Sequence, residues 1–291
     1  TGPDVSRLLK TTAKIKNILI YKLYNDQIHP ELQISTSGVY ICNSGCSKNF
    51  SFDVLFNVMT AIPILKVKSL SVNIGQEKIL SDISFELAAG ESMAIIGPNG
   101  SGKTTLVKAL LSILPFSGQV IWDQQVKIGY VPQKIDLEKN LPLTLKDFLA
   151  SKARIENLSE MEISRVLKLV SLTVNLLGKQ LSHLSAGQFQ RAAIAFALIG
   201  KPNFLILDEP TSGVDLPREE EIYDTIHRLQ DSEGLSIIIV SHDLSLVYKH
   251  AMKVLCVNQR LICFGSPQEV LTTDQLRELY GSRVYYHHEH H

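Results

Sequence analysis

A glycine-rich segment, Gly97–Thr104, constrains the fold of this chain more than any other feature. It has the pattern G-x4-G-K-[ST] and stands between a short apolar run, Ser92–Ile96, and a helical pattern, Lys103–Leu114. A strand, a glycine-rich loop and a helix in this order form a phosphate-binding unit of α/β proteins. The glycines permit backbone conformations that aim N–H groups at phosphate oxygens, and the helix N-terminus faces the same anion. The sequence therefore predicts a nucleotide-phosphate site.

The polar side chains of this loop have predictable roles. Lys103 can reach the β- and γ-phosphates as a point charge, and the Thr104 hydroxyl can ligate Mg²⁺. The alternative is an incidental glycine turn. The position of the segment between a predicted strand and a predicted helix argues against this alternative. The predicted nucleotide-binding set at this loop is Gly97, Pro98, Asn99, Gly100, Ser101, Gly102, Lys103, Thr104 and Thr105.

Two carboxylates, Asp208 and Glu209, follow the apolar run Phe204–Leu207. Side chains alternate along a strand, so the two groups cannot occupy equivalent positions. We expect Asp208 to coordinate Mg²⁺ and Glu209 to polarise or deprotonate the attacking water. Such a pair before a proline turn is otherwise often solvated, but its place after an apolar strand favours an ATPase site.

Strands alternate with helices along most of the chain, which predicts the α/β class with right-handed βαβ units. The apolar runs Phe204–Leu207 and Ser236–Val240 are typical of central strands in a covered parallel sheet. Two further strands, Leu65–Ile74 and Leu80–Leu87, flank a glycine-containing turn. Helical periodicity over Leu145–Leu177 is interrupted near residues 157–159, where a capping box is expected at residues 159–162.

Composition excludes several classes. Of the 291 residues, 45% are apolar and 20% charged, so wholesale disorder is not expected. The net charge of zero argues against a strongly basic nucleic-acid binder. Four cysteines do not make a disulfide scaffold, and a reducing compartment is the simpler interpretation. No run approaches the roughly 18–20 consecutive apolar residues that a membrane helix needs.

The first 58 residues show no sustained period and no motif, and the first methionine is Met59. We expect residues 1–58 to be a poorly structured extension or a non-native leader, with a genuine, weakly packed extension as the alternative. Cys42 and Cys46 with His29 have poor spacing for a zinc ribbon and lack a fourth ligand, so unrelated cysteines are expected.

The segment Leu184–Arg191 opens a predicted helix, Gly187–Ile199, and here the sequence resembles the ATP-binding cassette (ABC) ATPase family. The serine-glycine signature, the glycine-rich loop and the Asp-Glu strand occur in the family's order, and the resemblance covers roughly residues 62–270. It implies a P-loop NTPase cassette with a mostly parallel core sheet, a small antiparallel β subdomain and a helical subdomain at about 134–190. The nucleotide-binding domain is expected at 59–270, followed by a C-terminal segment at 271–291.

Three further matches extend the resemblance. Gln133 resembles the Q-loop glutamine and would sense Mg²⁺ and water, which makes Thr104, Gln133 and Asp208 the implied Mg²⁺ ligands. His242 resembles the switch histidine, which would bond the γ-phosphate beside Glu209. The segment 212–215 looks like the D-loop. With the signature, it adds these implied ATP contacts: Ser185, Ala186, Gly187, Gln188 and Asp215.

Two positions depart from the family pattern. Ala186 replaces the usual glycine, and because this adds only a methyl group we expect the anion-binding role to survive. The aromatic residue that stacks on adenine is not obvious, and Ile74 or Val72 occupies that neighbourhood. An aliphatic contact with the base is therefore expected, and the preference for ATP over GTP is implied by the family alone.

The resemblance also implies an assembly. Two cassettes would face each other head to tail, each signature closing over ATP on the other copy, so a homodimer on two transmembrane permease subunits is expected. The chain would lie peripherally at the cytoplasmic face of the inner (plasma) membrane. An importer would also employ a periplasmic or extracellular metal-binding protein, and no nucleic-acid partner is expected.

The body of the sequence looks most like the zinc-importer ATPase branch, on the segments 128–134, 141–143, 213–215, 241–246, 254–258 and 261–265. Manganese, iron or a chelate stay open as cargo. Less favoured alternatives are a non-transport ABC ATPase and a regulatory module without turnover. The C-terminal residues His287, His288, His290 and His291 form a candidate zinc-binding tail, with a tag remnant or an incidental tail as alternatives.

Overall fold

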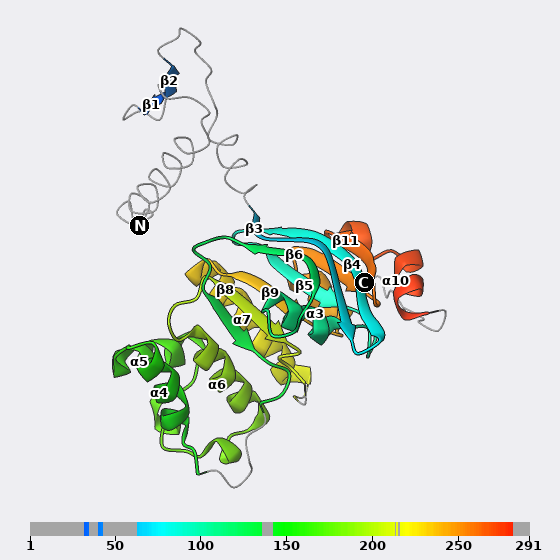
Figure 1. Cartoon of the computed structure of the whole chain (residues 1–291). Coiled ribbons are helices and arrows are strands. Elements are labelled where there is room, and N and C mark those ends of the chain that lie inside the picture. Colours follow the sequence, from blue (N-terminus) through cyan, green and yellow to red (C-terminus); the bar gives the residue numbers. More distant parts are fainter. Residues whose placement is uncertain are drawn as a thin grey trace, which may run out of the picture. The chain divides into compact units, whose positions relative to one another are not determined.

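The computed structural model describes residues 32–34, 40–42, 63–135, 142–212, 214 and 216–281 (Figure 1). The chain divides into two units, Thr1–Ala61 and Ile62–His291. In the first unit, β1 (Leu32–Ile34) pairs antiparallel with β2 (Tyr40–Cys42). His29, Cys46, Met59 and the histidine tail lie outside the described residues, as do Gly213 and Asp215.

A six-stranded sheet forms the centre of the second unit, in the order β11-β10-β5-β9-β8-β7. The five strands from β10 to β7 are parallel, and β11 pairs antiparallel with β10. The strand β5 thus lies between β9 and β10, which come much later in the chain. The strands are β5 (Ser92–Ile96), β7 (Ile128–Val131), β8 (Phe204–Asp208), β9 (Ser236–Val240), β10 (Lys253–Val257) and β11 (Leu261–Gly265). This topology agrees with the predicted mostly parallel α/β sheet.

Both faces of this sheet are buried, because alternate residues of each central strand enter two different cores. On β5, Met93 and Ile95 pack in a core with α3 (Lys103–Leu110) and the smaller sheet. Ala94 and Ile96 pack in a second core with the helices of the opposite face. Every residue of β5, β8 and β9 is buried, so the strands provide a fixed frame for the loops that follow them.

A three-stranded antiparallel sheet covers α3, in the order β4-β3-β6. Its strands are β3 (Pro63–Ile74), β4 (Glu77–Ala88) and β6 (Ser117–Trp122), drawn mainly in cyan in Figure 1. In β4, Phe85 and Leu87 are buried and Glu86 between them is exposed, the alternation of a half-covered sheet. The predicted strand pair is confirmed, with each strand slightly longer than expected.

Three helices build the helical subdomain seen at the lower left of Figure 1: α4 (Leu145–Ile155), α5 (Glu160–Leu169) and α6 (Ala186–Leu198). Between α5 and α6 lie two short 3-10 turns, η1 (Val174–Leu176) and η2 (Leu181–His183). Apolar side chains of all three helices enter the second core. The predicted break is confirmed, because Asn157 has a left-handed φ of 53° that ends the preceding helix.

Two local predictions were wrong. Ser159 is the N-cap of α5, but its side chain makes no capping hydrogen bond. The Glu162 backbone N–H donates to the Ser159 carbonyl oxygen instead, and the Glu162 carboxylate accepts hydrogen bonds from Arg165. The helix after the glycine-rich loop ends at Leu110 and not at residue 114. Ser112 has a φ of 57°, outside the helical region, so the chain turns there.

The remaining helices pack beside the central sheet: α7 (Leu216–Glu233), α8 (Leu244–His250), α9 (Pro267–Val270) and α10 (Thr273–Tyr280). Among the described residues, none of the helices combines the length and the hydropathy that a membrane span requires. Cys256 on β10 and Cys263 on β11 lie opposite each other, 4.8 Å apart at Cα, and are joined by a disulfide. This disulfide differs from the expectation that the cysteines are reduced.

Candidate nucleotide site at the carboxyl edge of the sheet

Four adjacent parallel strands bring the candidate residues to one edge of the sheet. The glycine-rich loop follows β5, His242 follows β9, Glu209 follows β8 and Gln133 follows β7. Because parallel strands end at the same edge, these loops meet there, where open α/β sheets bind their ligands. The described structure therefore gathers in one place residues that are far apart in the sequence.

The glycine-rich loop requires glycine at two positions for steric reasons. Gly97 has a φ of +156°, and a Cβ there would lie 2.1 Å from the backbone oxygen of Val257. Gly102 has a φ of +98°, and a Cβ there would lie 2.5 Å from the Leu80 Cδ2 atom. Larger residues would have to displace these neighbours. The loop is therefore held against β10 on one side and against β4 on the other.

Lys103 lies across this loop and is only 6% exposed. Its Nζ donates hydrogen bonds to the carbonyl oxygens of Gly97, at 2.9 Å, and Pro98, at 3.0 Å. Burial lowers the pKa of Lys103, while the nearby carboxylates of Glu209 and Asp208 act in the opposite direction. The ammonium group is thus kept inside the site by carbonyls of the glycine-rich loop and carboxylates at the end of β8.

Asp208 is fully buried at the end of β8, and its Oδ1 accepts a 3.2 Å hydrogen bond from the Thr104 hydroxyl. Among the described residues, its Oδ2 atom has no hydrogen-bond partner. Burial raises the pKa of Asp208, and the hydrogen bond from Thr104 opposes this. A buried carboxylate oxygen without a donor, beside a hydroxyl, is a donor set that suits Mg²⁺.

Glu209 points in a different direction from Asp208, as the alternation argument predicted. Its Oε2 accepts a 2.7 Å hydrogen bond from the Gln133 Nε2 group, and its backbone N–H donates to Val240 at 3.1 Å. Glu209 has a φ of 49°, which is uncommon outside glycine and concentrates at functional sites. The turn carries the carboxylate out of the buried strand and toward the loop after β7.

The signature segment begins α6 with a capping box. The Ser185 hydroxyl accepts a 3.3 Å hydrogen bond from the Gln188 backbone N–H, and the Gln188 side chain accepts one of 3.2 Å from the Ser185 N–H. Ser185 and Ala186 are exposed, whereas Gly187 is buried. Within the described part of the chain, no hydrogen bond or ion pair joins this segment to the glycine-rich loop.

The other expected residues have mixed outcomes. His242 is exposed in the loop between β9 and α8, next to the buried Ser241. Asp215 lies outside the described residues. Val72 is only 1% exposed and packs in the first core, which removes it as a contact for the base. Ile74 is 53% exposed at the end of β3 and stays available.

Residues outside the predicted motifs also surround the site, and sequence reasoning did not identify them. The backbone N–H of Gln259 donates a 2.9 Å hydrogen bond to the Ser101 carbonyl, just beyond the Val257–Gly97 contact. Tyr130 on β7 is half-buried near Asp208, and burial raises the pKa of its hydroxyl to about 12. No local pattern marks these residues, because their roles come from strand pairing over long sequence distances.

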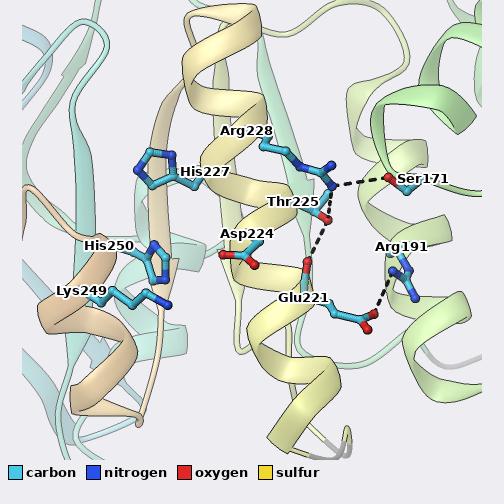
Figure 2. Close-up of a pocket in the computed structure, with 9 residues that line it drawn as sticks. All are labelled: Ser171, Arg191, Glu221, Asp224, Thr225, His227, Arg228, Lys249 and His250. Carbon is cyan, nitrogen blue, oxygen red and sulfur yellow. Dashed lines mark hydrogen bonds and ion pairs between the residues drawn. The ribbon is translucent and has the colours of Figure 1, made fainter.

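A cavity of about 630 Å³ lies elsewhere, beside α7 (Figure 2). None of its lining residues is a candidate site residue. Arg191 of α6 forms an ion pair with Glu221 of α7 at 3.3 Å, and the Arg228 guanidinium reaches the hydroxyls of Ser171 and Thr225. The cavity therefore lies where α7 meets the helical subdomain.

Comparisons with known proteins agree with this geometry. The family model described as ABC transporter matches residues 80–212, which include the glycine-rich loop, Asp208 and Glu209. The zinc import ATP-binding protein ZnuC of Haemophilus influenzae is 38% identical over 234 residues, 78% of this chain and 86% of that protein. ZnuC of Histophilus somni is 40% identical over 236 residues, 79% of this chain and 88% of that protein.

A solved structure described as a metal-chelate type ABC transporter in an inward-facing conformation has the same fold. It superimposes with a TM-score of 0.68 at 26% identity, covering 75% of this chain and 89% of the solved chain. The predicted cassette architecture, with its parallel sheet and helical subdomain, is thereby confirmed.

Proposed function

This chain belongs to the ABC transporter family, and from this premise we propose that it hydrolyses ATP to drive uptake of zinc through a separate membrane permease. The observation that carries the proposal is the division of labour at the end of β8. Asp208 turns inward to Thr104, and Glu209 turns outward to Gln133. A site with a buried metal-binding carboxylate and a separate candidate base has the parts for phosphoanhydride hydrolysis.

In this proposal the glycine-rich loop, residues 97–105, binds the triphosphate. Its backbone N–H groups and the start of α3 would surround the phosphates, and Lys103 would exchange its carbonyl partners for phosphate oxygens. Ile74, exposed at the end of β3, would contact the base. The buried position of Lys103 supports this role, because a desolvated ammonium interacts strongly with an anion.

Thr104 and Asp208, with Gln133, would hold Mg²⁺, which neutralises charge on the phosphate oxygens when bound. The unpartnered Oδ2 of Asp208 supports the fit. Glu209 would accept the proton of the attacking water, and the Gln133 amide would fix the direction of that carboxylate. His242, at the end of the neighbouring strand, would donate a hydrogen bond to the γ-phosphate.

We further propose that the complete site needs a second copy of the chain. Ser185–Gln188 is an exposed helix start that makes no described contact with the glycine-rich loop of its own chain. An exposed helix N-terminus, with a capping hydroxyl that can still donate a hydrogen bond, is suited to a phosphate presented from outside. In the dimer, Ser185, Ala186, Gly187, Gln188 and Asp215 of one copy would close over ATP held by the other.

The names of the relatives support zinc as the cargo and importers as the class. The proposed assembly is a homodimer on two permease subunits at the cytoplasmic face of the membrane, supplied by an extracytoplasmic metal-binding protein. The test is zinc uptake by proteoliposomes that contain the permease and this chain, with the metal-binding protein supplied, and with the Glu209→Gln variant as control. Uptake that needs ATP and is lost in the variant supports the proposal, and ATP hydrolysis without metal uptake would contradict it.

A metal chelate is the second candidate cargo, because a solved neighbour is described as a metal-chelate type transporter. The same vesicles distinguish the two. Free zinc taken up in preference to manganese, iron and a ferric chelate supports the zinc assignment. Uptake of a chelate at the expense of free zinc would replace it.

A further inference from the structure

Two side chains of α7 contact the loops that carry Glu209 and His242. The Thr211 hydroxyl donates a 2.5 Å hydrogen bond to the Glu219 carboxylate, and the Tyr223 hydroxyl donates one of 2.7 Å to the Ser241 Oγ atom. All four side chains are buried, each at 7% exposure or less. Glu219 and Tyr223 are four residues apart, so they lie on the same face of the helix.

Each contact lies next to a residue of the proposed reaction. Thr211 is two residues after Glu209, in a turn where the Ser212 N–H donates to the Glu209 carbonyl at 3.1 Å. Ser241 immediately precedes His242, and its Oγ also accepts a 3.1 Å hydrogen bond from the Asp243 N–H. The Ser241 hydroxyl therefore joins the two residues that flank His242, and it also accepts a hydrogen bond from α7.

We propose that Glu219 and Tyr223 are positioning residues that fix the separation of Glu209 and His242, the two groups placed beside the attacking water. The inference rests on the proposed function, because it assumes the roles given to those two residues. One rigid helix then determines the relative position of two loops from adjacent strands. Neither residue touches the nucleotide in this scheme.

The surroundings of Tyr223 support a fixed donor. Its ring is 3% exposed and stacks on His250 of α8, with centroids 5.9 Å apart. Burial raises the pKa of the Tyr223 hydroxyl, so it stays protonated and able to donate at physiological pH. Buried hydrogen bonds of this kind are costly to leave unmade.

The opposite face of α7 contacts α6, the helix that begins at the signature segment. Glu221, between the two positioning residues in sequence, pairs with Arg191 of α6, as Figure 2 shows. Since α6 begins at the Ser185 cap, α7 contacts both site loops on one face and the helix of the signature on the other. A displacement of α6 would therefore reach Glu209 and His242 through α7.

The test is steady-state ATP hydrolysis by the full chain, measured as kcat and KM, with ATP affinity and Tm measured in parallel. Tyr223→Phe and Ser241→Ala should each lower kcat about 3- to 10-fold and leave ATP affinity within about twofold, the effect of losing one buried hydrogen bond. Ser241→Thr keeps the hydroxyl and should retain kcat. Thr225→Val is the matched control, because it removes a buried α7 hydroxyl that contacts neither loop.

The double variant separates positioning from general loss of stability. If the Tyr223 hydroxyl acts through Ser241, Tyr223→Phe with Ser241→Ala should lower kcat no further than either change alone. Additive losses, an equal loss in Thr225→Val, or a lowered Tm with unchanged kcat would overturn the inference. His242→Ala tests the proposed function separately: if it abolishes turnover while Tyr223→Phe is as active as wild type, only the inference fails.

Discussion

The side-chain amide of Gln133 donates a 2.7 Å hydrogen bond to the carboxylate of Glu209. Gln133 follows β7, where the chain leaves the central sheet for the helical subdomain, and Glu209 follows the adjacent strand β8. The proposed base is thus bonded to the segment through which the helical subdomain is attached. Movement of that subdomain would change the direction of the carboxylate directly.

Glu209→Gln should lower kcat for ATP hydrolysis by about 100-fold or more, because an amide cannot accept the proton of the attacking water. ATP affinity should stay within about threefold, since the phosphate-binding loop is unchanged. Phosphate release and nucleotide titration measure the two quantities. Glu220→Gln, an isosteric change at an exposed carboxylate, serves as the control. Near-normal turnover in Glu209→Gln would show that the base is another group.

Lys103→Ala should weaken ATP binding about 10-fold or more, because a charge-assisted contact with the phosphates is lost in a desolvated site. Fluorescent-nucleotide titration measures the dissociation constant. Lys179→Ala, at an exposed lysine, removes the same charge away from the site and should leave the affinity unchanged. Equal affinities for wild type and Lys103→Ala would contradict the assignment of the phosphate site.

Asp208→Asn should raise the free energy of unfolding of the nucleotide-free protein at neutral pH by about 1 kcal/mol or more, because it removes a buried charge with an unpartnered oxygen. Burial raises the pKa of Asp208 in the folded state. Between the unfolded pKa, near 3.8, and this raised value, the folded protein binds more protons, so the wild type loses stability as the pH rises. Above the raised pKa, Asp208 is ionised in both the folded and the unfolded state, and the wild type has lost the full amount of stability.

The stabilisation by Asp208→Asn should therefore be largest at neutral pH and shrink as the pH falls toward the ordinary carboxyl range. Urea unfolding at several pH values measures it, with Asp274→Asn, at an exposed position, as the control. A gain that grew on acidification would have the wrong sign for a raised pKa. The same variant should hydrolyse ATP poorly, because the proposed Mg²⁺ ligand is lost.

Gly97→Ala should lower the free energy of unfolding by about 2 kcal/mol and weaken ATP binding, because the new Cβ would meet the Val257 carbonyl at 2.1 Å. Gly178→Ala is the matched control, since a Cβ there meets nothing within 4 Å. Denaturant unfolding and nucleotide titration compare the two. Equal stability of both variants would mean that β10 does not constrain the loop.

Ser185→Arg should leave ATP binding by the single chain within about twofold of wild type but abolish hydrolysis that depends on the dimer. A long cationic side chain at this exposed helix start would obstruct the face proposed to meet the second copy. Light scattering of the Glu209→Gln background with ATP should show dimers, and their loss on adding Ser185→Arg. Dimers that persist with both changes would show that the signature segment does not lie in the dimer interface.

The sequence predicted well those parts of the site that depend on short stretches of chain. The run Ser236–Val240 is apolar after its first residue, and it is a fully buried central strand. The alternation of side chains predicted that Asp208 and Glu209 diverge, and the two have different partners. Such features follow from local geometry, so a single sequence is sufficient to find them.

Contacts between distant segments could not be predicted in this way. Val72 and Ile74 share one face of a predicted strand. Val72 is buried in the first core, whereas Ile74, at the end of β3, lies outside that core and is 53% exposed. The support of Gly97 by Val257 depends on the pairing of β5 with β10, and the two residues are 160 positions apart in the sequence. Strand order is a property of the assembled sheet and leaves no local pattern.

The place of β5 between β9 and β10 has a consequence for synthesis on the ribosome. Both hydrogen-bonding partners of this strand are synthesised more than a hundred residues later. A nascent chain that ends at residue 212 therefore contains β5 but neither of its neighbours, β9 and β10. The glycine-rich loop that follows β5 should thus not reach its folded conformation in any nascent chain that ends before about residue 257. Arrested chains on either side of that length, probed for ATP capture, would show the site appearing in a single late step.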